Sequence, residues 1–143
     1  IAPGPEGGMK PWVLDASALA GALLDPPRYS AVLDLLEDDG ADVVVPHLAD
    51  VEVLSALRRV VRSGEADADR AGRALERHLE LPLRRFEHAP VLDRAFALRD
   101  NFSAYDAVYV ALAEALCAPL VTADARLGRA VRTWTEVEVL EVG

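Results

Sequence analysis

The stretch WVLDASALAGALL, Trp12–Leu24, decides the fold, because it places a short strand directly before a helix. The apolar run Trp12–Leu14 is bounded by Pro11 and Asp15, which is typical of a buried strand. A helix is predicted over 17–24, and the Asp-Pro-Pro sequence that follows it ends it. Asp15 therefore lies at the carboxyl end of the predicted strand.

The same alternation of strand and helix continues along the chain. Further strands are predicted at 42–46, 83–86, 120–122 and 137–142, and further helices at 29–37, 47–62, 66–79, 91–100, 104–116 and 124–131. Strands that alternate with helices in this way predict an α/β fold with a mainly parallel sheet. In such a sheet, functional sites form beyond the carboxyl ends of the strands.

Length and composition indicate one ordered domain. The chain has 143 residues, of which 52% are hydrophobic, and this excludes wholesale disorder. Residues 1–8 are rich in Gly and Pro and precede Met9, so we interpret them as the remnant of an expression tag and expect the domain to span 9–143. No signal peptide follows Met9 and no apolar run reaches the length of a membrane span, so we expect a cytoplasmic protein. The lone Cys117 excludes an intramolecular disulfide and is expected to be a small core residue.

The charge balance is acidic. The chain has 15 Lys and Arg against 24 Asp and Glu, a net charge of −9. This argues against a broad phosphate-binding surface or an anionic-membrane binder. It leaves nucleic acid chemistry open, because clustered acids can hold divalent metal ions that reverse the local field.

Four acids occupy positions that such a fold would bring to one edge of the sheet. Asp15 and Asp124 follow predicted strands, Glu52 lies one turn into a predicted helix, and Asp106 lies near the start of another. Each could equally serve as a helix cap or favour a helix dipole, and Asp50 has the character of such a helix-start acid. Clustered carboxylates repel one another, and a divalent cation bound between them relieves that repulsion. Ligation by oxygen atoms alone favours Mg²⁺ or Mn²⁺.

Four segments, taken in order, resemble one known family. They are VLDASAL (Val13–Leu19), ADVEVLSALRR (Ala49–Arg59), SAYDAVYVALAE (Ser103–Glu114) and LVTADARL (Leu120–Leu127). Together they resemble PIN-domain ribonucleases, and most of all the VapC-type toxin of VapBC toxin–antitoxin pairs. The resemblance extends from Trp12 to about Leu140. It implies a Rossmann-like, three-layer α/β/α sandwich.

The resemblance also implies a site and an activity. The acidic quartet of the family falls on Asp15, Glu52, Asp106 and Asp124. Asp15, Asp106 and Asp124 are then metal ligands, direct or through water, and Glu52 completes the shell or orients the attacking water as a base. The expected activity is Mg²⁺- or Mn²⁺-dependent hydrolysis of RNA phosphodiester bonds by a toxin that forms a homodimer and is inhibited by a VapB-type antitoxin.

Further residues match supporting positions of the family. Ser17 and Thr122 are expected to support the metal site, and Asn101 and Tyr105 to line the pocket. The chain has Thr122-Ala123-Asp124 where some relatives carry two acids, which leaves open how Asp124 contacts the metal. The number of metal ions also stays open.

The surface outside the site is acidic too, so RNA binding is expected to depend on local arginines. Arginine grips phosphate with two donors at once. The candidates for contact with RNA or with the antitoxin are Arg58, Arg59, Arg62, Arg84 and Arg85. The alternative is that these arginines belong to solvated helix faces.

Two other readings compete with a nuclease. Receiver domains and haloacid-dehalogenase-type phosphatases also place Asp after a first strand, but both would be expected to supply a lysine at a strand end. The only lysine, Lys10, precedes the first strand, and Ser17 stands where the phosphatase motif has a second acid. The remaining alternative is a PIN-like RNA- or protein-binding module without turnover.

Overall fold

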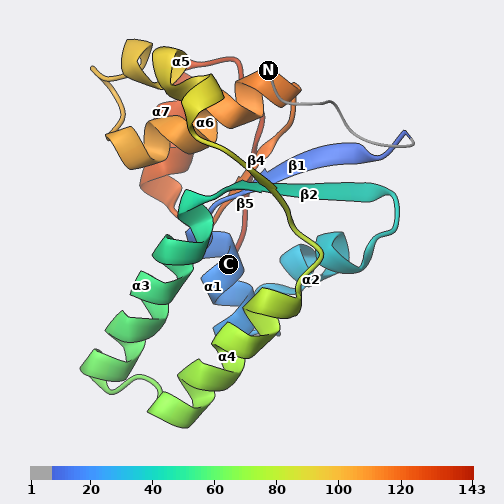
Figure 1. The fold of residues 1–143 in the computed structure, drawn as a ribbon, viewed down its shortest axis with the longest axis vertical. Helices are drawn as coiled ribbons and strands as arrows, with labels where there is room; N and C mark the ends of the chain where they lie inside the picture. Colours follow the sequence, from blue (N-terminus) through green and yellow to red (C-terminus); the bar gives the residue numbers. More distant parts are fainter. Residues whose placement is uncertain (1–7) are drawn as a thin grey trace.

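The computed structural model describes residues 8–143, so the predicted tag remnant lies outside the described residues except for Gly8. Strands and helices alternate along the chain as the sequence predicts (Figure 1). The strands are β1 (Lys10–Leu14), β2 (Ala41–Pro46), β3 (Arg84–Phe86), β4 (Leu120–Thr122) and β5 (Val139–Glu141). The helices are α1 (Ala16–Leu24), α2 (Ser30–Glu37), α3 (Leu48–Ser63), α4 (Ala68–Glu80), the 3-10 turn η1 (Ala89–Val91), α5 (Leu92–Ala97), α6 (Ala104–Leu116) and α7 (Ala125–Trp134).

The five described strands form one sheet, in the order β3-β2-β1-β4-β5, and every pair is parallel. The predicted mainly parallel α/β fold is therefore confirmed. After β1 and β2 the chain moves outward to β3, and it then returns past β1 to form β4 and β5. The order in which strands are added to the sheet therefore reverses between β1 and β4. The crevice beyond the carboxyl ends of the strands at such a switch point is where α/β sheets bind their ligands.

Helices cover both faces of the sheet, which gives the expected three layers (Figure 1). One layer holds α1 to α4, where α1 packs against both α3 and α4. The other holds α5 to α7, where α6 contacts β1, β2 and β4, and α7 contacts β4 and β5. The central strands are buried on both faces, which explains why every residue of β2 is buried and its centre is three consecutive valines, Val43–Val45. Among the described residues, no helix is both long and apolar enough to cross a membrane.

Two of the predicted helices have clearly different boundaries in the structure. The helix predicted at 91–100 begins as η1 and ends with α5 at Ala97, while the helix predicted at 124–131 continues to Trp134. The expectation of a buried Cys117 is wrong, because this residue ends α6 in the left-handed conformation (φ 51°) and its side chain is exposed. Cys117 is the C-cap of α6, so it lies beyond Leu116, the last residue on the buried face of that helix.

Candidate active site

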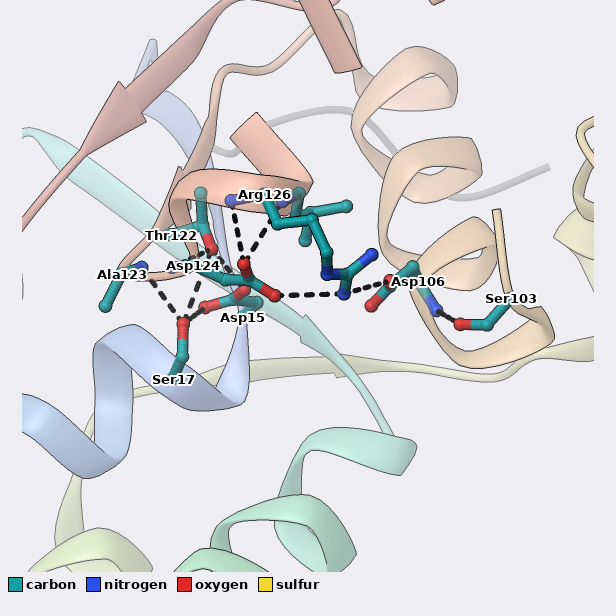
Figure 2. A network of polar contacts seen from close by, with 9 residues as sticks. Asp15, Ser17, Ser103, Asp106, Thr122, Ala123, Asp124 and Arg126 are labelled. Carbon is teal, nitrogen blue, oxygen red and sulfur yellow. Dashed lines mark hydrogen bonds and ion pairs between the residues drawn. The ribbon is translucent and has the colours of Figure 1, made fainter. Parts of the chain in front are cut away.

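The carboxyl ends of β1 and β4 meet at the switch point and bring Asp15 beside Thr122. Leu14 pairs with Val121, and the Asp15 amide donates to the Val121 carbonyl at 3.0 Å. The hydroxyls of Thr122 and Ser17 donate to the two Asp15 carboxylate oxygens at 2.5 and 2.6 Å (Figure 2). Ser17 also accepts from the Ala123 amide at 2.9 Å, which joins the start of α1 to the turn after β4. The two hydroxyls therefore fix the Asp15 carboxylate in one orientation.

Asp15 is the most deeply buried of the four predicted acids, with 5% of the residue exposed. Burial raises the pKa of its carboxyl above the ordinary 3.8, and the charge of Asp124 adds to the rise. Hydrogen bonds from Ser17, Thr122 and the Ala18 amide act in the opposite direction. The Ala18 amide bond also makes Asp15 the cap of α1, so the capping role considered from the sequence holds together with its place in the site.

Asp124 and Asp106 face each other across one arginine that the sequence did not single out. Asp124 caps α7 through the amides of Arg126 and Leu127 at 2.9 and 3.2 Å. The Arg126 guanidinium reaches Asp124 at 3.1 Å and Asp106, on the first turn of α6, at 3.4 Å (Figure 2). The charges of the two acids hold the pKa of Arg126 above its ordinary value, with that of Asp124 the largest cause. A cation therefore already lies between two of the predicted metal ligands.

Glu52 reaches the same cluster from the second turn of α3. Burial raises the pKa of Glu52 above its ordinary 4.5, and the charges of Asp106 and Asp15 raise it further. The side chain of Tyr109, on α6, lowers the same pKa. The Tyr109 hydroxyl is buried, and no acceptor or donor among the described residues lies in hydrogen-bonding geometry to it. The Tyr109 hydroxyl therefore lies against a predicted catalytic acid.

The structure thus gathers the four predicted acids into one cluster that is coupled by charge. Even so, no group of three or more His, Cys, Asp or Glu side chains within residues 8–143 is arranged closely enough to hold a metal ion. The donor set is nevertheless all oxygen, which suits Mg²⁺ or Mn²⁺. The Arg126 guanidinium carries one positive charge and offsets only part of the charge of Asp106 and Asp124, so the two carboxylates keep a net negative charge. The residues therefore fit such an ion once Arg126 yields its place.

The other predicted pocket residues do not join this cluster. Asn101 and Tyr105 are exposed, Tyr105 by 60%, and neither side chain contacts the four acids in the described part of the chain. Arg58, Arg59 and Arg62 lie exposed on α3, in the hairpin that α3 forms with α4 (Figure 1). Their roles stay predictions.

The two arginines of β3 are already engaged in ion pairs within the fold. Arg84 binds the Asp42 carboxylate on the neighbouring β2 through two nitrogens, at 2.5 and 3.1 Å. Arg85 binds Asp50 in the same two-donor manner, at 2.8 and 3.0 Å. The structure thus gives these two predicted RNA or antitoxin contacts an internal role.

Asp50 and Glu52, close in sequence, have different surroundings. The Asp50 carboxylate binds Arg85, and its Oδ1 is also hydrogen-bonded to Nε2 of the fully buried His78 at 2.7 Å. Glu52 turns toward Asp106 and Asp15. Asp50 therefore joins α3 to Arg85 and His78, whereas Glu52 belongs with the acid cluster.

The raised pKa of Asp15 predicts a pH dependence of stability in metal-free protein. Folded Asp15 holds its proton to a higher pH than in the unfolded chain, so the buried charge lowers stability at neutral pH. This cost disappears as the pH falls through the folded pKa. In EDTA, the difference between the Tm of wild type and the Tm of Asp15→Asn should therefore be larger, in favour of wild type, at pH 4 than at pH 7. A difference that is constant or falls would contradict the assigned burial effect.

Comparison with known proteins agrees with this fold. The PIN domain family model matches residues 12–132. VapC9 ribonuclease of Mycobacterium tuberculosis is 41% identical over 115 residues, covering 80% of this chain and 87% of the relative. VapC1 ribonuclease of the same organism is 39% identical over 130 residues, covering 90% and 96%. The crystal structure of VapBC2 from Rickettsia felis, bound to a promoter DNA fragment, superimposes with a TM-score of 0.68 at 15% identity and covers 93% of this chain and 99% of that chain.

The fold and the acid cluster therefore define a PIN-domain protein, and the chain belongs to that family. Within the family its relatives are the VapC ribonucleases.

Proposed function

We propose that this protein is a Mg²⁺- or Mn²⁺-dependent endoribonuclease and the toxin component of a type II toxin–antitoxin system. One observation carries the proposal: four acids from four separate segments converge at the switch point of a PIN-domain sheet. The proposal is supported by relatives at about 40% identity that are named ribonucleases.

The side chains have distinct roles in this proposal. Asp15, Asp106 and Asp124 hold the metal, and Ser17 and Thr122 keep the Asp15 carboxylate oriented for it. Glu52 completes the shell or accepts a proton from the attacking water, a task that its raised pKa suits. When bound, the ion would lower the pKa of water and offset charge on the phosphodiester.

We further propose a VapB-type antitoxin and a second copy of the chain as protein partners, and the cytoplasm, where RNA is available, as the place of action. The proposal of an antitoxin is supported by the VapBC complex among the similar structures. It is also supported by two large apolar residues of α3 that flank Glu52 in sequence and are exposed, Val51 by 64% and Leu54 by 52%. An apolar segment of a partner could cover them beside the site.

The test is incubation of antitoxin-free protein with a cellular RNA pool in Mg²⁺, in Mn²⁺ and in EDTA, with the cut ends mapped. Cleavage at discrete positions that requires a divalent ion is the expected result. Cleavage that continues in EDTA would contradict the metal mechanism. Absence of cleavage, together with retained RNA binding, would favour the module without turnover.

The arginines of α3 predict a salt effect on RNA binding. If Arg58 and Arg59 each contact a phosphate, replacing both with alanine should reduce the slope of log K against log salt by about 1.4, since each contact to single-stranded RNA contributes about 0.7. Fluorescence anisotropy of a labelled RNA at several salt concentrations measures this slope. An unchanged slope would return both side chains to the role of a solvated helix face.

A further inference from the structure

Arg126 is the one residue of the acid cluster that carries a positive charge (Figure 2). Its guanidinium nitrogen Nη2 reaches one carboxylate oxygen of Asp106 and one of Asp124, and no other partner is found for it within residues 8–143. These two acids are also two of the proposed metal ligands. The guanidinium and a divalent ion would therefore compete for the same carboxylate oxygens.

The contacts that hold the guanidinium are weak. They measure 3.4 and 3.1 Å, longer than the 2.7–2.9 Å that is usual for charge-assisted bonds. The Arg126 side chain is 68% exposed, so water and salt screen both pairs. A divalent ion has twice the charge and binds several oxygens at once, so it would displace this group readily.

The main chain of Arg126 stays fixed when its side chain moves. Its amide donates to the Asp124 carboxylate at 2.9 Å, and the residue lies in the first turn of α7. A displaced guanidinium would thus remain within reach of the cluster. It would then face the phosphate that the cluster is proposed to cleave, in a chain whose net charge of −9 offers RNA little general attraction.

We propose that Arg126 is a phosphate-binding residue of the RNA site, and that it occupies the space between Asp106 and Asp124 until a divalent cation takes it. This rests on the proposed function and adds a residue to it. Once free, the planar guanidinium can bind two phosphate oxygens together.

The test compares Arg126→Gln with Arg129→Gln. Arg129 lies exposed on the same helix and makes no ion pair in the described chain, so both variants remove one positive charge from α7. Mn²⁺ binding is measured without RNA by the electron paramagnetic resonance signal of free Mn²⁺. Arg126→Gln should bind Mn²⁺ about two- to fivefold more tightly than wild type, the range expected when an exposed ion pair no longer competes. Arg129→Gln should stay within about twofold, because its exposed side chain makes no ion pair with Asp106 or Asp124 in the described chain and exposed charges that are not in contact interact weakly in water.

A second readout uses a labelled single-stranded RNA of random sequence, 20 nucleotides long, in Mn²⁺. Glu52→Gln is present in every protein of this series to prevent cleavage. Arg126→Gln should weaken RNA binding and reduce the salt slope by about 0.7, one phosphate contact, while Arg129→Gln leaves the slope unchanged. Tighter Mn²⁺ binding with a reduced slope supports the proposal.

Other outcomes distinguish a failure of the role proposed for Arg126 from a failure of the proposed metal site. If wild type binds Mn²⁺ and Arg126→Gln binds it equally, the competition is disproved while the proposed metal site stands. If Mn²⁺ binds more tightly but RNA binding is unchanged, the phosphate contact is disproved. If neither protein binds Mn²⁺, the proposed nuclease mechanism fails and this inference fails with it.

Discussion

Replacement of Asp106 by Asn should abolish RNA cleavage and leave the fold intact. In the described structure the Asp106 side chain contacts only Arg126, and its carboxylate raises the pKa of Glu52 by repulsion. The cap of α6 uses the Asp106 amide and the Ser103 hydroxyl, which the substitution retains. Loss of one proposed metal ligand should reduce the cleavage rate by at least about 100-fold, since even groups that support a ligand contribute 10- to 100-fold.

The same variant should lose stabilisation by metal. An ion at about 100 times its Kd stabilises the folded state by about 2.7 kcal/mol, which raises the Tm by about 5–10 °C for a chain of this length. Wild type should show this rise in Mg²⁺ or Mn²⁺, and Asp106→Asn should show little of it. Asp34→Asn, an exposed acid on α2, is the matched control and should behave as wild type. Equal cleavage by Asp106→Asn and wild type would remove Asp106 from the mechanism.

Replacement of Asp50 by Ala should have the opposite pattern: a large loss of stability with the chemistry retained. Asp50 is the only hydrogen-bond partner of the fully buried His78 within residues 8–143, because the second ring nitrogen of His78 has none. It also binds Arg85 through two nitrogens. The substitution leaves a buried imidazole without any partner, at a cost of about 2–3 kcal/mol. The Asp50 side chain is 37% exposed, so the Arg85 pair adds little beyond this.

Thermal unfolding in EDTA measures this effect, and the Tm should fall by about 5–10 °C. Hydrogen bonds from Arg85 hold the pKa of Asp50 below its ordinary 3.8. The ionised Asp50 carboxylate therefore makes its full contribution to the free energy of unfolding above pH 3.8, and this contribution is lost as the pH falls through the lowered pKa. Asp69→Ala removes another acid from the first turn of a helix and should change the Tm far less. At a temperature where the protein is folded, Asp50→Ala should cleave RNA at nearly the wild-type rate. Loss of cleavage with an unchanged Tm would exchange the roles of Asp50 and Glu52.

Elements with strong local patterns were predictable from the sequence. The β-branched run of β2 and the apolar run of β1 predict buried parallel strands, and both are observed. Asp15 and Asp124 could be assigned to one edge because each follows a strand, and strand ends meet in a parallel sheet. Glu52 and Asp106 were assigned mainly from the family resemblance, because an acid near the start of a helix has several ordinary roles.

Features that depend on packing between distant segments were not predictable. Arg126 follows Asp124 by two residues, but its second partner, Asp106, comes from a helix that only the fold brings near. Arg84 and Arg85 look like free cations in the sequence, whereas their partners lie on β2 and α3. Tyr109 has helical spacing from Tyr105 and so resembles a core residue, and only the folded chain places its hydroxyl beside Glu52 of α3.

The proposed metal centre of the four acids is tested most directly by the anomalous scattering of Mn²⁺ in crystals of the protein. We expect a peak among the carboxylates of Asp15, Asp106 and Asp124, with the Arg126 guanidinium moved away from Asp106. A crystal in which Mn²⁺ scatters elsewhere, or in which Arg126 still bridges Asp106 and Asp124 at saturating Mn²⁺, would contradict it.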